Sequence, residues 1–140
     1  MPSTSRGETA VRAAFTVTGL ITTLPILALV NTAMLEMNYG VSDPGPMVLA
    51  LLQHRGVLQL LLGAALIWAA FFPPVRLAAA PAAILAKSAF LGLILPNAAA
   101  RPDLSTLSIV FDLSCIVVLA LVTVREVVAR RAGAVAHTPA

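Results

Sequence analysis

Residues 104–124 read LSTLSIVFDLSCIVVLALVTV, an apolar run of membrane-spanning length with one carboxylate, Asp112, near its middle. The hydrocarbon core of a bilayer is about 30 Å thick, and a helix needs roughly 20 apolar residues to cross it. An ionisable side chain at such a depth is costly and usually faces a partner or a water-filled cavity. Asp112 is therefore the first candidate functional residue of the chain.

The composition is that of an integral membrane protein. Of the 140 residues, 59% are hydrophobic and 11% are charged, whereas about a quarter of an ordinary soluble domain is charged. The mean hydropathy is +0.96. The predicted fold is all-α, a four-helix bundle in the membrane. Its transmembrane domain covers residues 13–124, with helices at about 13–35, 47–72, 77–95 and 104–124, between an N-terminal segment 1–12 and a basic tail 125–140.

The basic residues predict the orientation of this bundle. If the N-terminus lies in the cytoplasm, the cytoplasmic flanks of the helices carry most of the arginines, as the positive-inside rule requires. These are Arg6, Arg12, Arg76, Arg125, Arg130 and Arg131, against Arg55 and Arg101 on the other side. The sequence therefore predicts a multi-pass protein of the cell inner membrane with an N-in/C-in topology, in which segments 1–12 and 125–140 are cytoplasmic.

Two segments have irregular features. Pro25 lies inside the first and should kink it. The second, 47–72, is longer than a span needs and contains Gln53-His54-Arg55 near its start. Either its helix begins near Met47, or residues 47–55 lie along the membrane interface and the span begins at Gly56.

Small residues on the second segment predict a close helix contact. Gly56, Gln59 and Gly63 share one helical face. Glycines let two helices approach closely, and a glutamine can hydrogen-bond across the contact. This face should point into the bundle.

Lys87 is the proposed partner of Asp112. Counted from the connection between the third and fourth segments, the two residues lie at nearly the same depth, roughly 12 to 14 Å from its ends at 1.5 Å per residue. Ser105, Ser108, Asp112 and Cys115 recur at three- and four-residue spacing, which indicates one polar face on the last helix.

Other polar groups are expected at the same level. Asn31, Glu36, His54 and Arg55 belong to the outer half of the bundle, whereas the inner half has almost no ionisable groups. Arg55 and Lys87 balance Glu36 and Asp112, so the cluster can be neutral, as a site of low dielectric requires. The functional interpretation is a polar pocket with apolar walls. The structural alternative is an ion pair of Lys87 with Asp112 that only fixes helix register.

Such a pocket suits a hydrophobic small molecule such as an isoprenoid, a quinone or a lipid. A carboxyl group in apolar surroundings can act as a general acid, so a cofactor-independent cyclase or isomerase of a terpenoid is one hypothesis. The candidate catalytic residues are Asp112, Glu36 and His54, and the candidate substrate-binding residues are Lys87, Arg55, Asn31, Gln59 and Ser108.

Two other classes remain open. The chain could be an accessory or scaffold subunit that joins a membrane-protein partner or a second copy of itself. In spans and short loops it resembles small bacterial four-helix membrane proteins of the DoxX-like kind, and no residue role follows from that likeness. In length and helix number it also resembles small multidrug-resistance transporters. Those carry a key glutamate within the first span, whereas Glu36 falls at the end of it here.

Several kinds of site are not indicated. The chain has two histidines and one cysteine, too few for a zinc or haem site of the usual kind, and no metal or cofactor is expected. It lacks a glycine-rich phosphate loop and a Gly-x-Ser-x-Gly elbow. Its basic residues form no stripe interleaved with aromatics, so no nucleic-acid partner is expected.

Overall fold

The computed structural model is a bundle of helices that describes the backbone of residues 3–136 and the side chains of residues 6–132. No strand occurs in this described backbone. Four helical stretches are long and apolar enough to cross a membrane, namely Arg6–Leu29, Pro46–Phe71, Pro73–Ile94 and Thr106–Ala132. The predicted all-α fold with four candidate spans is confirmed.

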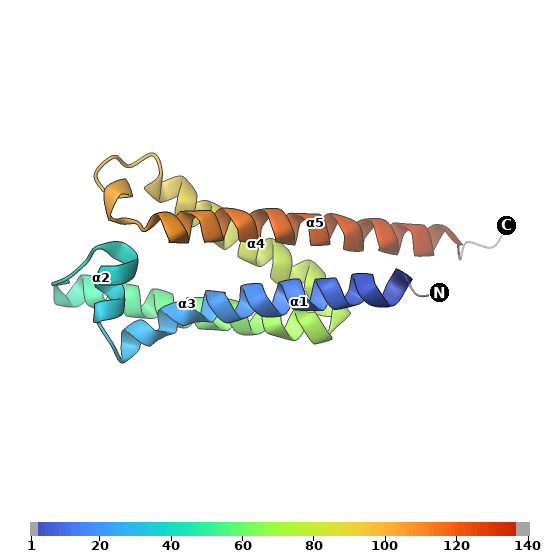
Figure 1. Cartoon of the computed structure of the whole chain (residues 1–140), viewed down its shortest axis with the longest axis horizontal. Helices are drawn as coiled ribbons and strands as arrows, with labels where there is room; N and C mark the ends of the chain where they lie inside the picture. The colour runs from blue at the N-terminus through green and yellow to red at the C-terminus, as the bar shows by residue number, and fades with distance from the viewer. Residues whose placement is uncertain (1–2, 137–140) are drawn as a thin grey trace.

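The helices form two contacting pairs. Helix α1 (Ser3–Thr23) lies beside α3 (Pro46–Phe71), and α4 (Arg76–Ile94) packs against α5 (Thr106–Ala136) and crosses to reach α3 (Figure 1). The start of α1 and the end of α5 lie at one end of the bundle, which we call the terminal end. The short helix α2 (Ala33–Tyr39) lies at the opposite end, which we call the α2 end.

The first span changes its helix type at Pro25. Helix α1 ends at Thr23, a 3-10 helix η1 covers Leu24–Leu29 without a gap, and α2 follows after a turn as a separate element. The proline has no backbone N–H to donate, and its ring clashes with the preceding turn, so the regular α-helix cannot continue through it. The first helix was predicted to reach residue 35 with a kink at Pro25, and its predicted end is wrong, because the helical turns stop at Leu29.

The second span is one uninterrupted helix. Helix α3 begins at Pro46 and runs to Phe71, so Gln53-His54-Arg55 lies within it. The helix thus begins near Met47, as the first of the two alternatives for residues 47–55 has it, and the position of these residues relative to the membrane stays a prediction. A proline at the first helical position is favoured because its missing N–H would have no partner there.

Glycines bring α1 and α3 into backbone contact. A Cβ atom added to Gly63 would lie 2.6 Å from the Gly19 carbonyl oxygen, and one added to Gly56 would lie 2.7 Å from the Pro25 carbonyl oxygen. Both glycines of α3 are buried. The predicted inward face of α3 is confirmed, and any larger side chain would push the two helices apart.

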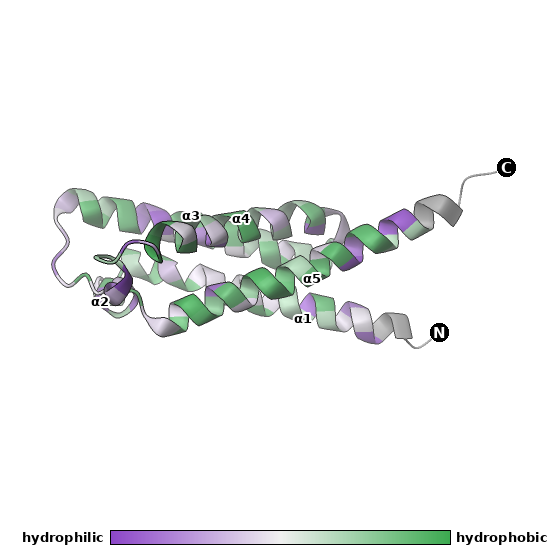
Figure 2. Ribbon diagram, turned by 90° about the horizontal axis from the view of Figure 1, so that it is seen from above, coloured by the Kyte–Doolittle hydropathy of each residue, from purple (hydrophilic) through white to green (hydrophobic). Residues whose placement is uncertain are grey.

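The last helix is longer than predicted. Its hydrophobic stretch is followed by more hydrophilic residues toward the C-terminal end, and the helix continues through them to Ala136 (Figure 2). No proline interrupts this stretch. At its start, the Ser108 N–H donates to Ser105 Oγ over 3.2 Å, which caps the helix. The remaining turns are the 3-10 helices η2 (Pro73–Val75) and η3 (Arg101–Asp103).

The tightly packed core occupies the terminal half of the bundle. Most of its members on α3 and α4 are alanines, so the helices approach closely there. The cluster consists of Val11, Phe15, Leu66, Ala69, Ala70, Ala79, Ala80, Ala83 and Leu119. The half of the bundle nearer α2 is packed less tightly, because a cavity lies among its helices.

Candidate functional site

A buried ion pair joins the third and fourth spans. Lys87 Nζ on α4 donates to Asp112 Oδ1 on α5 over 2.5 Å. The two residues are 2% and 7% exposed. Lys87 also lies 4.9 Å from the centre of the Phe111 ring. The predicted pairing of these residues is confirmed, and Asp112 and Cys115 both point into the bundle.

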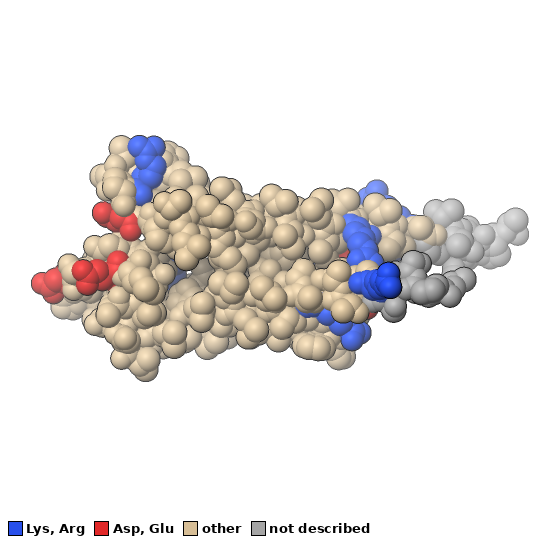
Figure 3. All heavy atoms as spheres, in the orientation of Figure 1, with Lys and Arg blue, Asp and Glu red and all other residues tan. Residues whose placement is uncertain are grey.

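A pocket of about 450 Å³ opens beside this ion pair, at the α2 end of the bundle. All four spans and α2 contribute to it, and most of its surface is apolar. In the space-filling view the molecule is hollowed between the lobe that carries α2 and the lobe that joins α4 to α5 (Figure 3). The apolar walls of the pocket are formed by Ile21, Leu24, Pro25, Leu27, Met34, Met37, Phe90, Leu104, Leu107 and Phe111.

Arg55 is the unpaired cation of this pocket. Its guanidinium carbon lies 3.7 Å from the centre of the Phe90 ring and 5.3 Å from that of Tyr39. Within the part of the chain whose side chains are described, it makes no hydrogen bond and no ion pair, and its Nε atom is buried. The charge is thus held by aromatic faces, a favourable contact that uses none of its N–H groups.

Two further polar groups beside Arg55 lack partners. Gln59 Oε1 and Thr22 Oγ1 are buried and have no hydrogen bond among residues 6–132. Both residues line the same pocket. Buried polar groups in proteins are nearly always hydrogen-bonded, so an unsatisfied set around one cavity needs an explanation. A bound molecule or ordered water would supply it.

The structure gathers some of the predicted site residues and separates others. Those that line the pocket are Lys87, Asp112, Arg55, Gln59 and Ser108. Those that are exposed and lie outside the pocket lining are Asn31, Glu36 and His54. Asn31 uses its Oδ1 atom to accept from the Ala33 N–H over 3.0 Å, where it helps to start α2. Asn31 lies in the turn that follows η1, and Glu36 lies on α2 beyond that turn, so both leave the line of the first span.

The predicted charge balance of the cluster is therefore wrong. Glu36 does not pair with Arg55, and Asp112 is occupied by Lys87. Among the side chains that the structure describes, Asp112 is the one acidic residue of the pocket lining. Within the described side chains, the pocket carries one positive charge that no carboxylate balances.

Comparisons with protein families, curated proteins and solved structures find no match to this chain. The resemblance to DoxX-like proteins thus rests on helix number and order. A functional assignment has to come from the chemistry of the pocket itself.

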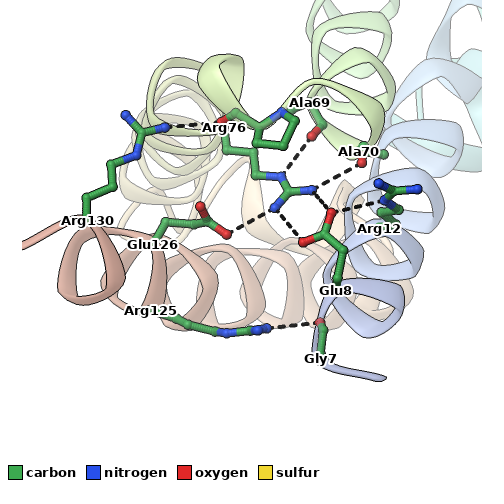
Figure 4. Close-up of polar contacts among 10 residues, drawn as sticks. Gly7, Glu8, Arg12, Ala69, Ala70, Arg76, Arg125, Glu126 and Arg130 are labelled. Carbon is green, nitrogen blue, oxygen red and sulfur yellow. Dashed lines mark hydrogen bonds and ion pairs between the residues drawn. The ribbon is translucent and has the colours of Figure 1, made fainter. Parts of the chain in front are cut away.

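A second charged cluster lies at the terminal end, where the sequence analysis expected almost no ionisable groups in the bundle. Arg76 is 2% exposed and binds both carboxylate oxygens of Glu8 at 2.6 and 3.0 Å, together with Glu126 Oε1 at 3.0 Å (Figure 4). It also donates to the Ala69 and Ala70 carbonyls at 3.0 and 3.2 Å. All five N–H groups of the guanidinium are therefore used.

This cluster has a local cause in the sequence. The carbonyls of residues 69 and 70 would normally accept from the N–H groups of residues 73 and 74, but both positions are prolines and have none. Arg76 supplies the missing donors from the start of the next helix. The sequence signal for this role is the stretch Phe71-Phe-Pro-Pro-Val-Arg76, in which two prolines remove backbone donors and an arginine follows them. In the sequence analysis, Arg76 served only to predict the orientation in the membrane. Because its donors are all occupied, we assign Arg76 a structural role.

Proposed function

We propose that the protein binds a hydrophobic small molecule, an isoprenoid, a quinone or a lipid, in the pocket at the α2 end. The observation that supports it is the set of three buried polar atoms without partners, Thr22 Oγ1, Arg55 Nε and Gln59 Oε1, in residues that line one largely apolar cavity. Ligand pockets typically enclose about 300 to 1,000 Å³ and combine apolar walls with a few polar groups. The volume of about 450 Å³ falls in that range.

Binding is better supported than acid–base catalysis. The hydrogen bond on Asp112 is donated by Lys87, so this carboxylate is already engaged. Glu36 and His54, the other candidate acid–base residues, lie outside the pocket lining. A cyclase or isomerase would need a proton donor that faces the bound molecule. The arrangement therefore favours a protein that holds or presents its ligand.

Mass spectrometry of molecules that co-purify with the protein in a mild detergent tests this proposal. The informative variant is Ser108→Trp, because Ser108 lines the pocket and an indole there would fill part of it. We expect a defined hydrophobic species to be enriched with the wild-type protein and depleted at least several-fold in this variant.

Ser114→Trp is the matched control. Ser114 lies on the same helix but is exposed, and its Oγ donates to the Val110 carbonyl over 2.7 Å. The same substitution there leaves the pocket open and should retain the ligand. Recovery of only bulk membrane phospholipid, at equal levels in all three proteins, would refute the proposal.

A further inference from the structure

The charges around the pocket restrict what it can bind. Lys87 and Asp112 pair with each other and contribute no net charge. Arg55 then remains as a cation without a carboxylate partner among the described side chains. An arginine within a spanning helix is costly unless something compensates its charge. Arg55 lies inside the candidate span Pro46–Phe71, so compensation is required here.

The surroundings of Arg55 leave its hydrogen-bonding edge available. The guanidinium carbon lies close to the rings of Phe90 and Tyr39, and its Nε atom is buried without a partner. The N–H groups of a guanidinium match the two oxygens of a carboxylate or phosphate. Among the described side chains, no acceptor occupies the N–H groups of Arg55.

Two other residues that line the pocket also offer donors. Thr22 has a hydroxyl without a partner, and Gln59 has an amide whose oxygen is unpaired. A half-turn of that amide exchanges its oxygen for its NH₂ group, and the two orientations are nearly isosteric. The carboxylate of Asp112, by contrast, is taken by Lys87. The free groups of the pocket thus suit a head group that accepts several hydrogen bonds.

We propose that the ligand is a single-chain amphiphile with an anionic head, and that Arg55 binds this head with help from Gln59 and Thr22. The inference rests on the proposed function and names its substrate class. A monoanion such as a fatty carboxylate neutralises the one unbalanced charge, whereas a dianionic phosphate monoester would reverse it. The apolar chain lies against the leucines and methionines of η1, α2 and α5.

A binding assay on the full-length protein in a neutral detergent tests the charge of the head. The probes are palmitate, hexadecyl phosphate and hexadecanol, which share one chain and differ in the head. We expect palmitate to bind at least tenfold more tightly than hexadecanol, because bonds between charged partners exceed those between neutral ones. Comparison of palmitate with hexadecyl phosphate shows whether the pocket prefers a carboxylate or a phosphate head, and we expect palmitate to bind more tightly.

Arg55→Gln tests the residue, and Arg101→Gln is its control, because Arg101 is exposed and outside the pocket lining. Arg55→Gln should lower palmitate affinity about tenfold or more and hexadecanol affinity by much less, because the alcohol carries no charge for Arg55 to neutralise. Arg101→Gln should change neither. Retention of hexadecanol binding shows that the variant is folded, and Arg55→Lys, which keeps the charge, should recover part of the palmitate affinity.

The outcomes separate this inference from the proposed function. Equal binding of palmitate and hexadecanol, both lost in Ser108→Trp, would retain the pocket and overturn the anionic head. Unchanged palmitate affinity in a folded Arg55→Gln protein would overturn the role of Arg55. Failure of all three probes, together with no co-purifying species, would overturn the proposed function itself.

Discussion

Arg76 shows how one residue compensates for a defect that its own neighbours create. Pro73 and Pro74 end α3 abruptly and leave the carbonyls of Ala69 and Ala70 without backbone donors. The guanidinium fills this gap and, with the same set of N–H groups, binds carboxylates from α1 and α5. A single side chain of the third span thereby joins it to the other three at the terminal end.

Arg76→Lys should destabilise the protein by about 1 to 3 kcal/mol, although the charge is kept. An ammonium has three donors on one atom and cannot serve two carbonyls and two carboxylates, so some of these buried acceptors lose their partner. Unfolding in mixed SDS micelles, followed by circular dichroism, measures the difference. A stability equal to that of wild type would show that the network contributes nothing.

For the ion pair of Lys87 with Asp112, we expect a second substitution to restore the stability that the first one removes. Lys87→Met alone strands a buried carboxylate and should cost about 3 to 5 kcal/mol. The double variant Lys87→Met with Asp112→Leu removes both charges and should regain most of that loss, because apolar replacements of a buried pair are often neutral. A double-mutant unfolding series measures the coupling. Equal stabilities of the single and double variants would contradict it.

At the residue scale, the contacts that follow from regular helix geometry could be predicted from the sequence. The depths of Lys87 and Asp112 follow from the helical rise, and the structure shows the pair. The position of Glu36 could not be predicted, because the turn between η1 and α2 has no fixed angle. Glu8 was missed as a partner of Arg76 because the two residues are 68 positions apart. Nothing local in the sequence connects them.

At the scale of elements, α1 and α3 are the most intimately packed pair of helices. Gly19, Gly56 and Gly63 let carbonyl oxygens of one helix reach the position that a side chain of the other would take. The glycine spacing on α3 was enough to predict the buried face, whereas its partner on α1 emerged only from the structure. This pair forms one wall of the pocket.

Gly63→Ala should destabilise the protein by about 1 to 3 kcal/mol, the usual cost of overpacking. The new methyl group would lie 2.5 Å from Thr23 Cγ2 and 2.6 Å from the Gly19 carbonyl oxygen, and backbone cannot yield cheaply. The same unfolding assay measures the loss.

Gly92→Ala is the matched control for that substitution. Gly92 lies within α4, and a Cβ atom there would meet nothing within 4 Å. Alanine favours a helix over glycine by roughly 0.5 to 1 kcal/mol, so this variant should be as stable as wild type or slightly more so. Loss of stability in both variants would mean that the close contact of α1 with α3 is not the cause.

On the scale of the whole molecule, the two ends of the bundle differ. The terminal end holds the alanine-rich core and the Arg76 network, and most of the basic residues visible in Figure 3 lie there. The α2 end holds the pocket, and acidic residues are visible on it together with a basic group. Composition was sufficient to predict the four spans. It could not predict that one end is closed and the other hollow, because that depends on how the helices cross.

The charge distribution leads to a prediction about topology. We expect both termini in the cytoplasm, because arginines concentrate at the terminal end and positive residues are retained there. In bacterial cells, a fluorescent protein fused after residue 140 should fluoresce, and alkaline phosphatase at the same site should be inactive. The opposite pair of results would place the pocket at the cytoplasmic face.

The Arg76 network also bears on how the chain is made. Glu8 belongs to the first span and Glu126 to the last, and Nη1 of Arg76 donates to both. Synthesis proceeds from the N-terminus, so Glu8 and Arg76 have been translated before Glu126. The network is complete only when the final helix is in place, and a chain truncated before Glu126 leaves one N–H of Arg76 without its carboxylate partner.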